Sequence, residues 1–154
     1  NLSNANFDGA ILSGADFRGS NLSEASFEGA ILDRAQLAKA VLPGTNFHKA
    51  SLRWVDLSAQ TIRLKTLSYA DLSGSNLSGA DLSNQDMNQA SLRNTDLSGT
   101  ILTGASLFKA NLTGANLTGA NLTGANLTGA TVHETNLSDA ITTDAVLDDS
   151  WPTQ

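Results

Sequence analysis

The chain has 154 residues, of which 40% are hydrophobic, 16% are charged and none is cysteine. This length suits one domain, and the absence of cysteine excludes disulfides. The formal net charge of −6 disfavours non-specific binding to nucleic acid or acidic membranes, and no apolar run reaches the length of a membrane-spanning helix.

A five-residue repeat begins at the first residue and keeps one phase to residue 140. All 28 positions spaced by five from Leu2 to Leu137 are Leu, Phe, Ile, Met or Val, and we call them centres. All 13 glycines lie two residues after a centre, where a turn needs a positive φ. An α-helix would scatter the centres around its circumference, and a flat strand would alternate them between faces. The pattern therefore predicts a solenoid whose centres point to a shared interior.

Similar residues recur at intervals of twenty. Phe7, Phe27 and Phe47 keep this spacing, and residues 26–32 repeat the pattern of residues 6–12. Like residues stacking on like would place four repeats in each coil. The spacing therefore predicts a square cross-section and about seven to eight coils over the whole chain.

The repeat unit itself resembles a known family motif, in which Ala and then Asp or Asn precede Leu and two variable residues. It is carried by Ala15-Asp16-Phe17, Ala70-Asp71-Leu72, Ala80-Asp81-Leu82 and Ala115-Asn116-Leu117. The chain resembles the pentapeptide-repeat proteins from Asn1 to about Ala140. The resemblance implies an all-β fold, a right-handed quadrilateral β-helix with the centre and the preceding small residue facing inward. Members of this family are common in cyanobacteria, and a few bacterial members imitate DNA and bind DNA gyrase.

The pattern is weakest over residues 54–69. Three inward positions carry a residue larger than the expected alanine: Val55, Gln60 and Lys65. A buried, unpaired Lys65 ammonium would be costly, so we expect the backbone to bulge there and release it. Gln85 and Thr45, one coil to either side, are available to bond this ammonium.

Exposed aromatic and basic residues surround this irregular segment. Stacking by twenty sets Arg34 over Trp54 on one side and Lys49 over Tyr69, with His48, on the adjoining side. Trp, Tyr and Arg are enriched at interface hot spots. We hypothesise a patch that binds a protein partner, with a tolerated structural defect as the simpler interpretation. The candidate patch consists of Arg34, Lys49, Arg53, Trp54, Arg63 and Tyr69.

The two ends of the chain differ. After Leu137 the repeat decays, so we expect a pentapeptide-repeat β-helix at 1–140 and a degenerate last coil with a C-terminal cap at 141–154. Acidic residues and Pro152 would protect the open edge there, with Trp151 lying across the last coil. The first coil has no such cap. We therefore expect either weak end-to-end self-association through residues 1–20 or further residues before Asn1.

No constellation of residues indicates catalysis. His48 and His133 would lie about four coils, or roughly 20 Å, apart, so they cannot share a metal or a triad. The chain has no cysteine and no third histidine for a zinc site, and its serines lack a nearby base. The sequence predicts a non-enzymatic protein with no cofactor and no metal.

Three classes of function are compatible with the repeat. The first is a non-catalytic structural or protein-interaction solenoid with an unidentified protein partner. The second is a DNA mimic that binds gyrase, although basic residues over 18–65 and an uncharged stretch at 110–132 interrupt the acidic surface. The third is an ice-binding solenoid with flat Thr and Asn arrays. We expect no direct nucleic-acid or membrane binding, and we favour the cytoplasm, with the periplasm or thylakoid lumen as alternatives if a signal was removed.

Overall fold

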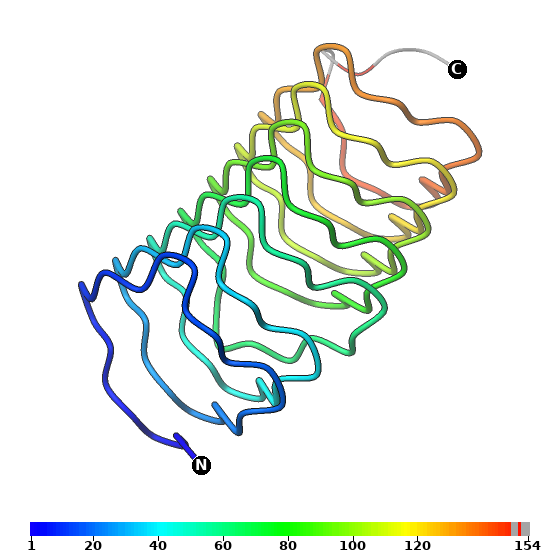
Figure 1. Cartoon of the computed structure of the whole chain (residues 1–154). Coiled ribbons are helices and arrows are strands. Elements are labelled where there is room, and N and C mark those ends of the chain that lie inside the picture. Colours follow the sequence, from blue (N-terminus) through cyan, green and yellow to red (C-terminus); the bar gives the residue numbers. More distant parts are fainter. Residues whose placement is uncertain (149–150, 152–154) are drawn as a thin grey trace.

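The backbone winds into an elongated stack of coils with the two termini at opposite ends (Figure 1). The computed structural model describes residues 1–148 and Trp151. These residues form neither a helix nor a strand of several residues, because each repeat contributes a single bridge residue followed by a turn. The described residues contain no helix long and apolar enough to span a membrane.

Parallel bridges hold neighbouring coils together, and each one between described residues joins two positions twenty apart. They run from Asn6 with Ser26 to Asn126 with Val146. A centre donates its N–H to the carbonyl nineteen residues later, as Leu12 does to Ile31 at 2.7 Å. The predicted repeat solenoid is confirmed, and its bridges have the spacing that the stacked phenylalanines predicted.

The turn after every centre from Leu2 to Leu137 except Ile62 places a left-handed residue two positions later. All 13 glycines have a positive φ there, as predicted, and so do 15 other residues. A side chain in this conformation costs about 1–2 kcal/mol, which is why glycine recurs. Trp54, at φ 57°, is one of the residues that bear this cost.

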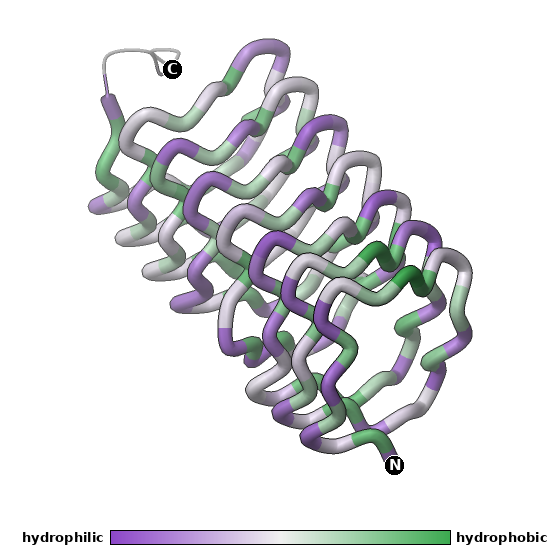
Figure 2. The backbone as a smooth tube through the Cα atoms, turned by 90° about the vertical axis from the view of Figure 1, so that its left-hand side faces the viewer, coloured by the Kyte–Doolittle hydropathy of each residue, from purple (hydrophilic) through white to green (hydrophobic). Residues whose placement is uncertain are grey.

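The centres and the alanines line one continuous core. Leu22, Phe27 and Leu72 are fully buried, and hydrophobic residues alternate with hydrophilic ones along every coil (Figure 2). The Phe7 and Phe27 rings stack at 4.8 Å between centroids, and the Phe27 and Phe47 rings at 5.2 Å. The predicted inward direction of the centres is therefore confirmed.

The Asn or Asp before each centre serves the turn. In the repeat at 111–115, Asn111 Oδ1 accepts hydrogen bonds from the Thr113 N–H at 3.0 Å and the Thr113 hydroxyl at 2.7 Å. The same pair of bonds recurs in the following repeats with Asn116, Asn121 and Asn126. An Asx turn of this kind satisfies a backbone donor. It explains why Asn-Leu-Thr repeats without change.

The irregular segment departs from the rule at residues 62–65. Leu64, at a turn position, is buried, whereas Lys65, at an inward position, is exposed. The predicted release of the Lys65 ammonium is thus confirmed. The predicted partners act differently, because the Gln85 side chain accepts the Leu64 N–H at 3.0 Å and the Thr45 carbonyl accepts the Lys65 backbone N–H at 2.9 Å.

At the C-terminal end, the coil ladder continues to Val146, which bridges Asn126. The Gly129 N–H donates to Asp148 Oδ2 at 2.6 Å, and Trp151 packs against the core. Residues 149–150 and 152–154 of the predicted cap lie outside the described residues.

Candidate partner-binding patch

Trp54 lies in the turn after the centre Leu52. We call this turn, together with the Arg34 turn above it, the corner. Half of its surface is exposed (50%). The Arg34 guanidinium lies 4.8 Å from the centre of its ring, and that of Arg53 lies 5.1 Å away. A Cβ atom added to Gly74, on the opposite side from Arg34, would come within 2.8 Å of the indole. A small residue in the next coil thus leaves room for the ring.

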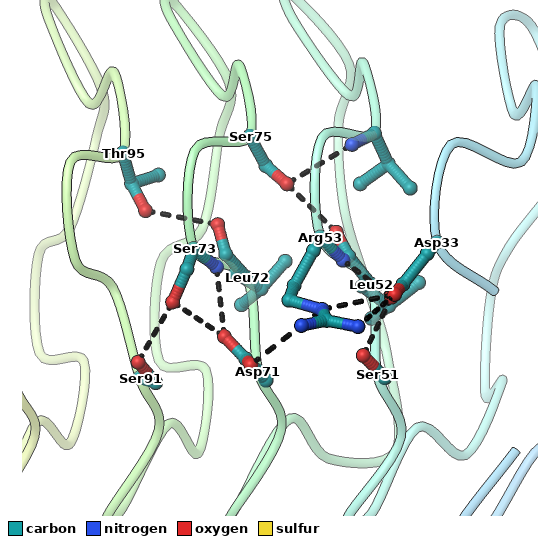
Figure 3. Close-up of polar contacts among 11 residues, drawn as sticks. Asp33, Ser51, Leu52, Arg53, Asp71, Leu72, Ser73, Ser75, Ser91 and Thr95 are labelled. Atoms are coloured by element: carbon teal, nitrogen blue, oxygen red, sulfur yellow. Dashed lines mark hydrogen bonds and ion pairs between the residues drawn. The ribbon is translucent and has the colours of Figure 1, made fainter. Parts of the chain in front are cut away.

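A carboxylate network holds Arg53 in place beside Trp54 (Figure 3). Asp33 accepts bonds from the Arg53 Nε at 2.9 Å, from its Nη2 and from the Ser51 hydroxyl. Burial of Asp33 raises the pKa of its carboxyl, but the bonds from Arg53 and Ser51 outweigh burial and hold that pKa below its usual range. Asp71 lies 4.0 Å from the other side of the guanidinium. The charge of the Arg53 guanidinium is therefore balanced by Asp33 and Asp71, and its bonds to Asp33 hold the side chain in place.

Arg34 differs from Arg53 in its electrostatic environment. Among the described residues it forms no ion pair, and its guanidinium contacts only the Trp54 ring. Arg18, in the neighbouring column, is bound through two nitrogens to Asp16 at 2.9 and 2.7 Å. Arg34 consequently presents the one cation of this corner that is available to a partner.

Tyr69 and His48 form a second cluster on the adjoining side. The Tyr69 ring meets the His48 ring edge-on at 5.5 Å, and the Gln89 amide donates to its hydroxyl at 2.7 Å. The His48 Nδ1 lies 2.8 Å from the Ser68 hydroxyl. Lys49 shares the column of Tyr69 without an ion pair among the described residues.

The six predicted patch residues therefore do not form one cluster. Arg34, Arg53 and Trp54 are in contact, whereas Arg63 lies on another side and pairs with Asp81 at 3.4 Å. Nothing in the residue types distinguishes these positions. Their place in the twenty-residue register does, because Arg63 lies ten residues, or two repeats, beyond Arg53 in the same coil.

The coil ladder is interrupted directly beside Trp54, a feature that the sequence pattern did not reveal. Within residues 1–148, no bridge joins Gln36 to Asp56 or Val41 to Thr61. The bridges on both sides of this break, Ile31 with Ser51 and Asn46 with Thr66, are intact. We call the gap between residues 35–42 and 55–62 the seam. The bridges between these two coils are therefore missing along the seam and present along the rest of their contact.

A cavity of about 260 Å³ opens at the mouth of the seam. Its lining comes from three successive coils and comprises Arg18, Arg34, Ala35, Gln36, Leu37, Ala38, Trp54 and Asp56. A second hollow, of about 510 Å³, is lined by Arg34 and Trp54 together with Ser13, Gly14, Asp33 and Arg53. The exposed indole of Trp54 thus lines two hollows of the surface.

Comparison with protein-family profiles identifies the family of the chain. The sequence profile described as pentapeptide repeats matches in eight copies over residues 1–35, 20–58, 67–104 and 105–141. The chain belongs to the pentapeptide-repeat family. The matched ranges of this pentapeptide-repeat protein leave out residues 59–66, the segment with the irregular corner. A comparison with curated proteins gives no match.

Solved structures of other pentapeptide-repeat proteins resemble it. HetL, involved in heterocyst differentiation regulation in the cyanobacterium Nostoc, is 32% identical with a TM-score of 0.45, and the match covers 97% of this chain and 73% of HetL. QnrB1, a plasmid-mediated fluoroquinolone resistance protein, is 22% identical with a TM-score of 0.60 over 95% of this chain and 79% of QnrB1. A pentapeptide-repeat protein from the cyanobacterium Cyanothece is 28% identical with a TM-score of 0.40 over 93% and 88%.

Proposed function

We propose that this pentapeptide-repeat protein is a non-catalytic interaction module that binds a protein partner at the corner formed by Arg34, Arg53 and Trp54. The observation that carries the proposal is the half-exposed Trp54, fixed between Arg34 and Arg53 over Gly74. A fixed aromatic ring beside an arginine loses little conformational entropy on binding, as interface hot spots require. Lys49 and Tyr69 would extend the contact around the adjoining side.

The regular stack supplies the rigidity that such a module needs. We propose four repeats per coil, a right-handed quadrilateral cross-section and seven to eight coils. The twenty-residue spacing of the bridges supports the number of repeats. The end-to-end association expected for residues 1–20 stays a separate prediction, which light scattering over a range of protein concentrations checks.

Partner capture from a native extract tests the proposed function. The wild-type chain and Ile101→Ala, which removes an exposed apolar side chain elsewhere, should retain the same protein. Trp54→Ala and Arg34→Ala should each lose it, and the purified partner should then bind the wild-type chain directly. Equal capture by the wild type and Trp54→Ala contradicts the proposal.

The DNA-mimic alternative is less well supported by the distribution of charge. Arg18, Arg53 and Arg63 neutralise acidic residues of the first half through ion pairs, whereas a mimic needs a dense acidic surface. A gyrase supercoiling assay separates the two functions. Inhibition that survives Trp54→Ala would favour the mimic.

A further inference from the structure

One side of the stack carries an exposed apolar strip. This side lies between the Lys49 turn and the Trp54 turn. Its outward bridge positions in successive coils are Ile11, Ile31 and Ser51. Among the described residues, only the bridge between Ile11 and Ile31 joins two apolar side chains, and these are 80% and 39% exposed. The two isoleucines thus place a contiguous apolar surface in water.

The turns beside this strip leave it uncovered. Gly9 and Gly14 lie in the turns on either side of Ile11, and Gly29 lies in one of the turns beside Ile31. A Cβ atom added to any of the three glycines would have no atom of a more distant residue within 4 Å. No side chain at these three turn positions therefore stands beside the isoleucines.

Opposite charges flank the strip. Glu28 lies three residues before Ile31 and Arg34 lies three residues after it, so the two charges border the side at opposite edges. Both residues are exposed, and neither forms an ion pair within the described part of the chain. The Trp54 ring covers a face of the Arg34 guanidinium, and the N–H groups at the edge of a stacked guanidinium stay available to a carboxylate. The coil therefore presents acid, apolar residue and base in that order.

This order is complementary to itself. A two-fold axis parallel to the stack and passing over Ile31 turns a second copy so that its Glu28 lies over Arg34 of the first copy. The reverse contact forms by symmetry, and Ile11 and Ile31 each meet the same residue of the other copy. Self-complementarity of one surface patch is what a two-fold dimer requires.

The corner takes part in the same contact. In the next coil, the axis brings His48 of one copy to the exposed Trp54 of the other. Lys49 faces Arg53, whose charge is already balanced by two carboxylates of its own chain. The symmetry that pairs Glu28 with Arg34 therefore places no unbalanced like charges opposite each other in this coil.

Asp71 limits the extent of the contact. It follows Ser51 at the bridge position of the next coil (Figure 3), so two copies of its carboxylate would lie opposite each other. Like charges directly opposite are unfavourable. The contact therefore covers about three coils, or roughly 14 Å of the stack at about 4.8 Å per coil. A stable dimer buries a larger area than this, so the association is weak.

We propose that the protein partner bound at the corner is a second copy of this chain, packed side by side and parallel through Ile11, Ile31, Glu28 and Arg34. This inference rests on the proposed function and identifies the partner. The small contact corresponds to a dissociation constant between about 10 μM and 1 mM.

Charge reversal tests the inference by sedimentation equilibrium of the full chain. At about 0.15 M salt the Debye length of about 8 Å screens the repulsion between net charges of −6, and the wild type should associate reversibly. Glu28→Arg and Arg34→Glu should each weaken association at least about tenfold, because both attractive contacts become repulsive. An equimolar mixture of the two variants should restore association, since opposite charges then meet at both contacts.

Glu24→Arg and Lys39→Glu are the matched controls. Both residues are exposed in turns that do not border this side, and their reversal changes the net charge by the same amounts. Each control variant should associate like the wild type.

Three outcomes overturn the inference. The first is a wild type that stays monomeric up to about 1 mM. The second is a mixture of Glu28→Arg and Arg34→Glu that associates no better than either variant alone. The third is association that neither reversal weakens, which would indicate contact through another surface. Trp54-dependent capture of a different protein supports the proposed function even where the chain is monomeric, so the two failures are distinguishable.

Discussion

Trp54 lies against the backbone of Gly74 in the next coil, where a Cβ atom would approach the indole to 2.8 Å. Gly74 also has φ 71°, so alanine there would be strained and would displace the ring. The position of the proposed anchor is thus set by a residue that carries no functional group.

We expect Gly74→Ala to shift Trp54 fluorescence to longer wavelength and to lower the free energy of unfolding by about 1–2 kcal/mol. Fluorescence is measured with Trp151→Phe as the background, since the chain has two tryptophans. Gly119→Ala is the matched control, because Gly119 has a similar φ of 66° and no atom within 4 Å of an added Cβ. It should show the stability loss without the spectral shift, and an equal shift in both variants contradicts the prediction.

Removal of the Asp33 carboxylate should destabilise the fold and loosen Arg53. Asp33→Ala leaves the Ser51 hydroxyl and the Arg53 guanidinium without their acceptor, which costs about 1–3 kcal/mol. Urea unfolding measures this loss. In the exposed pair of Arg18 and Asp16, Arg18→Ala should cost less than about 1 kcal/mol. A comparable loss in both variants would show that burial of Asp33 contributes nothing.

The carboxylates predict how stability depends on pH. A hydrogen bond from Arg18 lowers the pKa of Asp16 to about 2, and the pKa values of Asp33, Asp81 and Asp96 are also lowered. A carboxyl whose pKa is lower in the folded state than in the unfolded state stabilises the fold at every pH above its unfolded pKa. This stabilisation is lost as the pH falls through the folded-state pKa. The Tm should therefore be nearly constant from pH 7 to about 5 and fall steeply below about 4.

Asparagine substitutions identify the groups responsible for this decline. Asp81 owes its shift to bonds from the Ser83 hydroxyl and N–H, and Asp96 to bonds from the Ser98 N–H and hydroxyl. Asparagine at both positions keeps a turn acceptor but does not titrate. The double variant should lose less Tm between pH 5 and 2 than the wild type, and an unchanged slope argues against the assignment.

Hydrogen exchange should reveal the seam in the free protein. The N–H groups of Asp56 and Thr61 have no backbone acceptor among the described residues, whereas those of Asn76 and Asp81 in the same columns donate at 2.9 Å. We expect the first two amides to exchange at least about tenfold faster than the second two. Equal protection of all four would show that the ladder closes in solution.

The repeat rule predicted the fold because five residues recur without insertion from residue 1 to 140. A large apolar residue at every centre determines the inside, and the phenylalanines determine the register. The sequence analysis did not predict the Asn turn, in which Asn Oδ1 accepts a bond from the backbone N–H two residues later. Its signal was present in the unvaried Asn-Leu-Thr triplet.

The candidate site was less predictable. The twenty-residue spacing placed Arg34 over Trp54, and this contact occurs. It also grouped Arg63 with them, although that side chain pairs with Asp81 on another side. The seam could not be foreseen, because Gln36, Val41 and Thr61 occupy ordinary bridge positions. The missing bridges lie close to residues 62–65, where the backbone departs from the repeat.

The exchange of Leu64 and Lys65 has a consequence for protein engineering and for the evolution of such stacks. Leu64 enters the core and Lys65 leaves it, yet Leu67 is again a buried centre. The backbone can therefore depart from the repeat at residues 62–65 while the centres that follow keep their register. A foreign loop grafted directly after the exposed Lys65 would project outward, keep Leu64 in the core and leave the remaining repeats in phase.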